Sequence, residues 1–533
     1  MPASSRWFRF VALAAVAVIS GTVNCIAQND QKPQPGGTAI TISAGEPTGL
    51  NPTITSNTPE QFAGCIVYEG LVLINQETGK AEPALAKSWE ISSDEKTYTF
   101  HLRDANFHDG TPLTSEDVRY TLMEVSSKFH PTFSAQTARK IQSVTTPDPK
   151  TVKITLTQPF GPFLLNLTCT NGAGILPAHL FTGTDPLKNL TTLDAPVGTG
   201  PFKFAEWVRG SHIRMVRNEE YWDKGKPYLD SIVMQFVPNS ASRTQSMLAG
   251  QADFVSGYEF SSSDVKTARA TPSLKLEKSG FAASQVLAFF NLTRKPISDV
   301  EVRRALLTAT DTAYIAATAF PGTGEGGTKP WNSIPWSANE NVDYRRDNAF
   351  DAKRAGQLLD EAGYKPDANG VRFKLGVIYD AQAPELDQIA QTLKAWWKAV
   401  GVEVELQPVE EAVFVPRVFT NADFDVMLTG YSTYNDPAIG IARIYISSTI
   451  GKLYGNASHY SNPQVDALFE KGAASTNLQE RGAEYKKAQE IIVRDLPTIT
   501  LAERYFNDVM STKLHGVHGY LGTGQWANAW LEQ

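Results

Sequence analysis

Cysteine is scarce in this chain, and long apolar runs and common catalytic motifs are absent from it. Three cysteines in 533 residues are too few for a disulfide-dense scaffold. The run Phe10 to Ile19 has about ten residues, which is short of the ~20 that a transmembrane helix needs. There is no G-x-S-x-G, H-E-x-x-H or Walker A pattern. Serine-hydrolase, zincin and P-loop chemistry therefore have no support in the sequence.

Metal and cofactor signals are equally sparse. The eight histidines are scattered, and the close pair His515 and His518 has no acidic or cysteine partner in a metal-binding pattern. Gly322 to Gly327 matches G-x-G-x-x-G, but an alanine-rich helical segment precedes it and Lys329-Pro330 follows where a helix should open. We therefore expect a flexible loop at these glycines, no dinucleotide site and no cofactor.

The net charge and the length further limit the possible binding partners and the number of domains. The net charge is -7, so a nucleic acid or an anionic membrane surface would be a poor partner. The composition, 42% hydrophobic and 20% charged, is ordinary for a globular protein. At 533 residues the chain exceeds the ~100–200 of a typical domain, which predicts two to four units.

The N-terminus has the features of a secretory signal peptide. Arg6 and Arg9 form a basic region, an apolar stretch follows, and Cys25-Ile26-Ala27 is an acceptable cleavage site. We predict a signal peptide over 1–27 and cleavage after Ala27. A lipoprotein would instead use Cys25, but Asn24 before it fits a lipidation site poorly. In an oxidising compartment Cys65 and Cys169 are then either bonded to each other or two separate buried thiols.

Strand and helix patterns alternate toward both ends of the mature chain, which predicts an α/β protein with an insertion. Strands are expected at 38–43, 94–103, 231–237 and 402–406, and helices at 240–249 and 351–362. One further helix carries six apolar residues on a single face: Leu386, Ile389, Ala390, Leu393, Trp397 and Val400.

The sequence predicts three helix N-caps. Thr114 and Asp117 have the spacing of a capping box, and Asp299 precedes the helical segment from Val300. Asp436 stands before Pro437, a common pairing of N-cap and first helical residue.

Several stretches resemble one known family. They are EPALAKSWE (82–90), YTFHLR (98–103) with FHDGTPLTSEDV (107–118), GTGPFKF (198–204) with RNEEYWDKGKPYLD (217–230), FNLTRKPISDVEVRRAL (290–306), and Phe424–Val426 followed by Asn435–Pro437. Together they resemble the extracytoplasmic solute-binding proteins of family 5, which serve ABC importers of peptides, nickel and opines. The resemblance covers nearly the whole mature chain.

The resemblance implies a fold and its domain boundaries. The fold is α/β and type II periplasmic-binding-protein-like, with two hinged lobes and an inserted third domain. By analogy, 28–60 is a leader and the start of lobe I, and 61–186 is the inserted domain II. Lobe I continues over 187–288, lobe III covers 289–492, and 493–533 returns to lobe I.

The resemblance also implies a function. We expect a monomeric periplasmic receptor, and no enzyme, that captures a small polar ligand in an interlobe cleft and delivers it to the permease of an ABC importer. Peptides, modified peptides, opine-like and sugar-like compounds are candidate ligands. Two rival hypotheses are a secreted hydrolase that uses an acidic pair and a chaperone that holds unfolded peptides.

Seven residues are candidate ligand contacts. Family alignment puts the segment 431–435 at the cleft wall, namely Tyr431, Ser432, Thr433, Tyr434 and Asn435. Peptide-binding members hold the ligand's ammonium with an aspartate three residues before the Asp/Glu-Pro pair, where this chain has the neutral Thr433. Asp380 stands where dipeptide binders have an arginine, and it is expected to meet a cationic group or to be solvated. Arg443 is expected to meet an anion or to be a surface charge.

Overall fold

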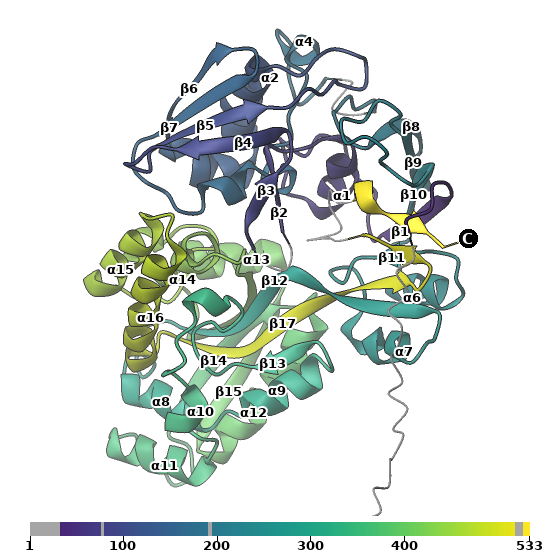
Figure 1. The fold of residues 1–533 in the computed structure, drawn as a ribbon. Coiled ribbons are helices and arrows are strands. Elements are labelled where there is room, and N and C mark those ends of the chain that lie inside the picture. The colour runs from purple at the N-terminus through teal and green to yellow at the C-terminus, as the bar shows by residue number, and fades with distance from the viewer. Residues whose placement is uncertain (1–31, 76–78, 190–193, 518–525, 533) are drawn as a thin grey trace, which may run out of the picture. The chain divides into compact units, whose positions relative to one another are not determined.

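A mixed sheet of eleven strands dominates the computed structural model, which describes residues 32–75, 79–189, 194–517 and 526–532 (Figure 1). In spatial order its strands are β15 (Val402–Val409), β14 (Phe373–Asp380), β16 (Val426–Ser432), β12 (Leu274–Phe290), β17 (Thr498–Ser511), β11 (Phe254–Val255), β1 (Thr38–Ser43), β10 (Ser231–Phe236), β9 (His212–Arg217) and β8 (Phe202–Val208), with β13 (Gly324–Gly326) added on β17. Gln34 to Gln533 form one unit.

Two long strands, β12 and β17, connect the two ends of this sheet. They pair antiparallel from Leu274 opposite Ser511 to Phe289 opposite Thr498, with register shifts on the way. The C-terminal half of β12 also pairs with β16, and the C-terminal part of β17 also pairs with β11. Each half of the sheet is thus tied to the other by these two crossover strands (Figure 1).

Around β12 and β16 the sheet is buried on both faces. Val286, Ala288 and Phe290 of β12 pack into one cluster, while Leu287 and Phe289 pack into the other. This alternation follows from the two-residue period of a strand. The helices that cover these faces include α8 (Val300–Thr308), α9 (Thr312–Ala319), α11 (Ala352–Glu361), α12 (Pro384–Ala399), α14 (Ala442–Tyr445), α15 (Pro463–Ala473) and α16 (Leu478–Asp495).

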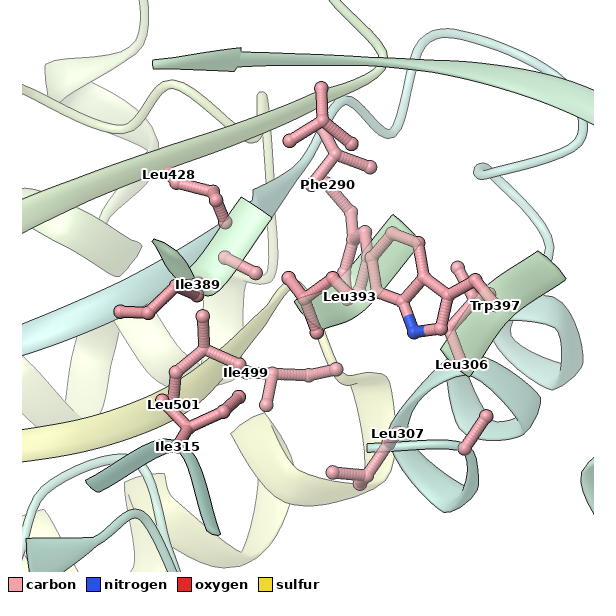
Figure 2. Close-up of a cluster of buried hydrophobic side chains, with 14 of the residues drawn as sticks. Phe290, Leu306, Leu307, Ile315, Ile389, Leu393, Trp397, Leu428, Ile499 and Leu501 are labelled. Atoms are coloured by element: carbon pink, nitrogen blue, oxygen red, sulfur yellow. The ribbon is translucent and has the colours of Figure 1, made fainter. Parts of the chain in front are cut away.

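Helix α12 shows why its sequence is helical. All six predicted face residues are buried in one cluster, and Leu393 and Trp397 pack near Phe290 and Leu306 (Figure 2). Pro384 at the start suits the first turn, where a missing N–H costs little. The helix is followed by β15, which pairs parallel with β14. Burying one side chain of this size stabilises the fold by about 1.5–3 kcal/mol.

The other end of the large sheet contains the predicted βαβ unit. Strand β1 lies between β10 and β11 and pairs parallel with both, and α6 (Ser240–Leu248) connects those two strands. Asn239 caps α6 by accepting the Ser242 N–H at 2.9 Å. Helix α1 (Thr58–Val67) packs in the same cluster as β1, β9 and β10. It runs across the predicted boundary at residue 61; the domain boundaries stay predictions.

A separate antiparallel sheet forms a third core, in the order β4 (Ala86–Ile91), β5 (Thr97–Leu102), β7 (Thr151–Leu156) and β6 (Ile141–Asp148). The capping box at α2 (Ser115–Tyr120) is confirmed, because the Asp117 carboxylate accepts the Thr114 N–H at 2.8 Å and the Thr114 side chain receives the N3 backbone N–H. The Asp299 cap of α8 is confirmed as well, accepting from the Glu301 N–H at 3.0 Å.

The structure decides the pairing of the two cysteines and the conformation of the glycine-rich segment. Cys65 and Cys169 are bonded to each other, so the alternative of two separate thiols is wrong. The glycines at 324–326 form β13, paired with Arg504 to Ala502 of β17, so the expected flexible loop is also wrong. A side chain at Gly327 would overlap the Thr500 carbonyl, which explains why the segment needs glycine.

The predicted signal peptide and its cleavage site fall outside the described residues, as does His518. Within the ranges that the structure describes, no helix has the length and apolar character to cross a membrane.

Candidate ligand-binding site

Segments far apart in the sequence enclose a small cavity of about 140 Å³. Its walls come from the start of α1, from the segments around His130 and Thr170, from the crossover strand β17, and from the end of β16. The lining residues are Ser56, Thr58, Gln61, His130, Thr132, Thr170, Asn171, Tyr258, Ser432, Tyr434 and Phe506. We call this the small cavity.

The wall of the small cavity is polar but uncharged. Among the eleven described lining residues none is Asp, Glu, Lys or Arg. Hydroxyls, two amides and aromatic rings can donate and accept hydrogen bonds there, but they offer no full charge to a ligand.

His130 is the one titratable imidazole of this wall, and it is neutral. The side chain is only 1% exposed, and burial lowers its pKa to about 4, an effect that the backbone of Thr55 partly opposes. Its Nδ1 accepts the Phe133 backbone N–H at 3.0 Å. Nε2 is buried as well, with almost no accessible surface.

The structure divides the predicted segment 431–435 between the wall and the interior. Ser432 and Tyr434 line the small cavity, whereas Tyr431 and Thr433 are buried. Tyr434 and Asn435 have φ values of 46° and 51°, which non-glycine residues adopt at an energetic cost. These two left-handed residues turn the chain sharply between β16 and the next helical turn. The role of the segment in binding stays a prediction.

A helical turn, Pro437–Ile441, begins directly after this bend, and Asp436 caps it. The carboxylate accepts the Ala438 N–H at 2.9 Å, which confirms the predicted cap. No local pattern predicts the second partner of this carboxylate. Arg481 of α16 donates to the same carboxylate at 2.6 Å, and both side chains are 2% exposed.

Arg443 packs against the segment 431–435. Its guanidinium lies 4.8 Å from the ring centroid of Tyr431 and 5.5 Å from that of Tyr434. It also donates to the carbonyls of Gly440 at 3.2 Å and Ser432 at 3.3 Å. A cation held this way stabilises the rings and places positive charge behind the Tyr434 wall. Contact between Arg443 and a ligand stays a prediction.

Asp380 lies at the end of β14, where its carboxylate accepts the Gln382 N–H at 2.9 Å and shapes the turn into α12. It is half-buried and does not line the small cavity. Its meeting with a cationic ligand group also stays a prediction.

A larger cavity of about 720 Å³ adjoins the small one, because Tyr258 lines both. It contains charged side chains: Arg504 and Glu385 form an ion pair at 3.3 Å, and Arg243 and Glu259 also line the wall. Burial raises the pKa of the Glu259 carboxyl, whose Oε2 has no partner among the described groups. The two cavities together offer an uncharged and a charged region.

Sequence reasoning missed most of this wall. The lining residues are spread along the chain from Ser56, through His130 and Thr170, to Phe506. No local sequence pattern could therefore group them. The bend at Tyr434 could have been suspected, since Asn435-Asp436-Pro437 is a common turn sequence.

The model of the bacterial extracellular solute-binding proteins, family 5 Middle, matches residues 80–452. The chain belongs to this family. Family members are transport binding proteins rather than enzymes. This chain is a solute-binding component of an ABC importer.

Similar proteins span nearly its full length. Heme-binding protein A of Haemophilus influenzae is 30% identical and covers 95% of this chain and 94% of its own length. The oligopeptide-binding protein AppA of Bacillus subtilis is 28% identical, and the match covers 87% of this chain and 86% of AppA. The structure of HbpA2 from Haemophilus parasuis has a TM-score of 0.80 at 26% identity. The match covers 93% of this chain and 100% of HbpA2. These matches agree with the type II periplasmic-binding-protein fold.

Proposed function

We propose that this protein captures a peptide-like ligand with one end in the small cavity and the remainder in the larger cavity. It then delivers the ligand, as a periplasmic monomer, to an ABC permease of the inner membrane. The observation that carries the proposal is the polar, uncharged wall that several distant segments contribute to the small cavity. A wall of this composition suits the amide and carbonyl groups of a peptide chain.

The size of the cavities supports a ligand longer than a dipeptide. The larger cavity falls within the ~300–1,000 Å³ of typical ligand pockets, and the shared Tyr258 connects it to the small one. Its two arginines and two glutamates provide partners for a charged end or side chain. The neutral Thr433 provides none for an ammonium group.

A heme ligand is the alternative suggested by the name of one relative. The small cavity would have to accept part of a flat, largely apolar ring among hydroxyl and amide groups, which would be desolvated without partners. The peptide-like ligand therefore fits this wall better, and hemin serves as the comparison.

Calorimetric titration with dipeptides, tetraalanine, an opine and hemin tests the proposal, followed by mass analysis of the recovered ligand. A receptor binds one class with micromolar or tighter affinity and returns it unchanged. Cleavage of the ligand would favour a hydrolase, weak binding of every unfolded peptide would favour a holding chaperone, and tight binding of hemin alone would exclude the peptide-like ligand.

A further inference from the structure

Two of the four charged side chains of the larger cavity already bind neighbouring segments. Arg243 is buried and donates to the Glu259 carbonyl at 3.0 Å and to two further carbonyls. The Glu259 carboxylate accepts the Ala44 N–H at 3.0 Å, and its other oxygen is buried. Arg504 and Glu385 are more accessible, with side chains 20% and 33% exposed. These two residues carry the charges that a ligand in the larger cavity can reach.

The Arg504 guanidinium is held in place by aromatic rings and has unused donors. Its centre lies 5.5 Å from the ring centroid of Phe320 and 4.8 Å from that of Phe506. Among the described residues Glu385 is its one hydrogen-bond partner, through Nη1 at 3.3 Å. A guanidinium has five N–H groups in a plane, an arrangement that matches the two oxygens of a carboxylate. The group is therefore positioned to bind an anion.

Glu385 does not depend on Arg504 to keep its own charge. It lies in the first turn of α12, where the helix dipole favours a negative side chain. Burial lowers the pKa of the Arg504 guanidinium, and Glu385 opposes this shift from a partly exposed position. Because partly exposed ion pairs contribute little, a carboxylate from the ligand can replace Glu385 beside Arg504.

Arg504 and the small cavity lie on one face of the large sheet. Ser432 of β16 is paired with Ser284 of β12, and Ser284 is paired with Arg504 of β17. Side chains directly opposite each other on neighbouring strands share a face. Strands lie about 4.8 Å apart, so Arg504 is about 10 Å along the sheet from Ser432, which lines the small cavity. An extended peptide covers this span with about three residues, at ~3.3–3.6 Å each.

We propose that Arg504 binds the terminal carboxylate of a short peptide in the larger cavity, and that the peptide runs along this sheet face toward Ser432 and the small cavity. The inference rests on the proposed function, because it takes the two cavities as the capture site. No charged side chain is among the described residues that line the small cavity, so that wall does not compete for the carboxylate. Arg504 then sets both the polarity of the bound peptide and its preference for a free acid.

Calorimetry with tetraalanine and tetraalanine amide tests this role, because the amide lacks the terminal negative charge. The wild-type protein should bind the amide about tenfold to a hundredfold more weakly, as expected for the loss of a charge-assisted hydrogen bond. In Arg504→Met the free acid should lose the same factor, and the two peptides should bind equally. Arg504→Lys keeps the charge without the paired donors and should keep part of the preference. Equal affinities for the acid and the amide in the wild type would overturn the inference.

Glu385→Gln and N-acetyl-tetraalanine are the controls for the second charge of the cavity. The substitution removes the internal partner of Arg504, so the preference for the free acid should persist or increase. Acetylation removes the positive end of the peptide and should not cause the loss that amidation causes. A loss on acetylation with none on amidation would assign the charged contact to Glu385 and contradict the role of Arg504.

Thermal unfolding verifies that the variants are folded, and the comparison of peptides in the wild type does not depend on them. Tyr434→Ala separates this inference from the proposed function. If Tyr434→Ala weakens the binding of tetraalanine but amidation does not, the capture site stands and the role of Arg504 is wrong. If tetraalanine does not bind, or binds Tyr434→Ala and Arg504→Met as it binds the wild type, the proposed function fails as well.

Discussion

Arg481 and Asp436 form an ion pair in the interior, with Nη2 2.6 Å from Oδ1 and each side chain 2% exposed. The pair joins α16 to the residue that follows the cavity-lining bend at Tyr434. Arg481 also donates to the Gly472 carbonyl at 2.7 Å, and its guanidinium lies 5.0 Å from the Trp336 ring centroid. The bend is therefore anchored from a helix that is 45 residues away in the sequence.

Breaking this pair from one side should be costly, because it leaves a buried charge without compensation. We expect Arg481→Met to lower the free energy of unfolding by about 3–5 kcal/mol in urea titrations. The exposed pair of Arg354 and Glu361 provides the control, and Arg354→Met should cost less than about 1 kcal/mol. Equal losses in the two variants would show that the buried pair does not stabilise the bend.

The Cys65–Cys169 bond connects α1 to the segment that contributes Thr170 and Asn171 to the small cavity. It closes a loop of 104 residues in sequence separation. Replacing both cysteines by alanine should reduce the stability by about 2–5 kcal/mol. Reduction of the wild-type protein should lower its unfolding midpoint, and the same treatment should leave the double variant unchanged. A wild-type midpoint that is insensitive to reduction would contradict the bond's contribution.

Two histidines, the buried His130 and the half-buried His108, should make the protein acid-sensitive. Burial lowers the pKa of both His108 and His130 to about 4, below the ~6.5 of an unfolded chain. Between these values the unfolded state binds more protons than the folded state, so stability falls as pH falls through this window. Each histidine should cost about 2 kcal/mol between pH 7 and pH 5.

Urea titrations at pH 7 and pH 5 check this effect, with His108→Gln as the informative variant. The His108 ring bonds to the backbone of Gly198 and Gly200, so the variant loses stability at pH 7. Its further loss toward pH 5 should nevertheless be smaller than that of the wild type. An unchanged pH dependence would show that His108 does not titrate with a lowered pKa.

Glycine at position 327 is required by packing. Gly327→Ala should destabilise the protein by several kcal/mol, because the new methyl group would overlap the Thr500 carbonyl beside β13. Gly356→Ala, within α11 where the nearest atom is 3.7 Å away, should instead stabilise it by about 0.5–1 kcal/mol. Thermal unfolding compares the two, and a tolerated alanine at 327 would contradict the close approach.

Features encoded by neighbouring residues could be predicted from the sequence. The six-residue face of α12 and the caps at Thr114, Asp299 and Asp436 depend on spacings of a few residues, and the structure confirms them. Features that depend on distant segments could not. Arg481 as the partner of Asp436 is one such feature, and the wall of the small cavity is another.

Gly324 and Gly326 show a second limit of structure prediction from local sequence. The residues that flank their motif do not support a dinucleotide site, and the inferred loop is a strand paired with β17. Glycine has low strand propensity by itself, and tertiary contact with the crossover strand overrides it. Such contact has no signal in a local window of sequence.

The most direct test of the capture site compares two tyrosines in the same backbone conformation. Tyr434 lines the small cavity and has φ 46°, whereas Tyr454 has φ 51° and bonds to Glu411 outside the described cavity walls. Calorimetry with tetraalanine measures the affinity of both alanine variants. We predict that Tyr434→Ala weakens binding at least tenfold while Tyr454→Ala binds like the wild type. Wild-type affinity in Tyr434→Ala would contradict the assignment of the small cavity as the site of capture.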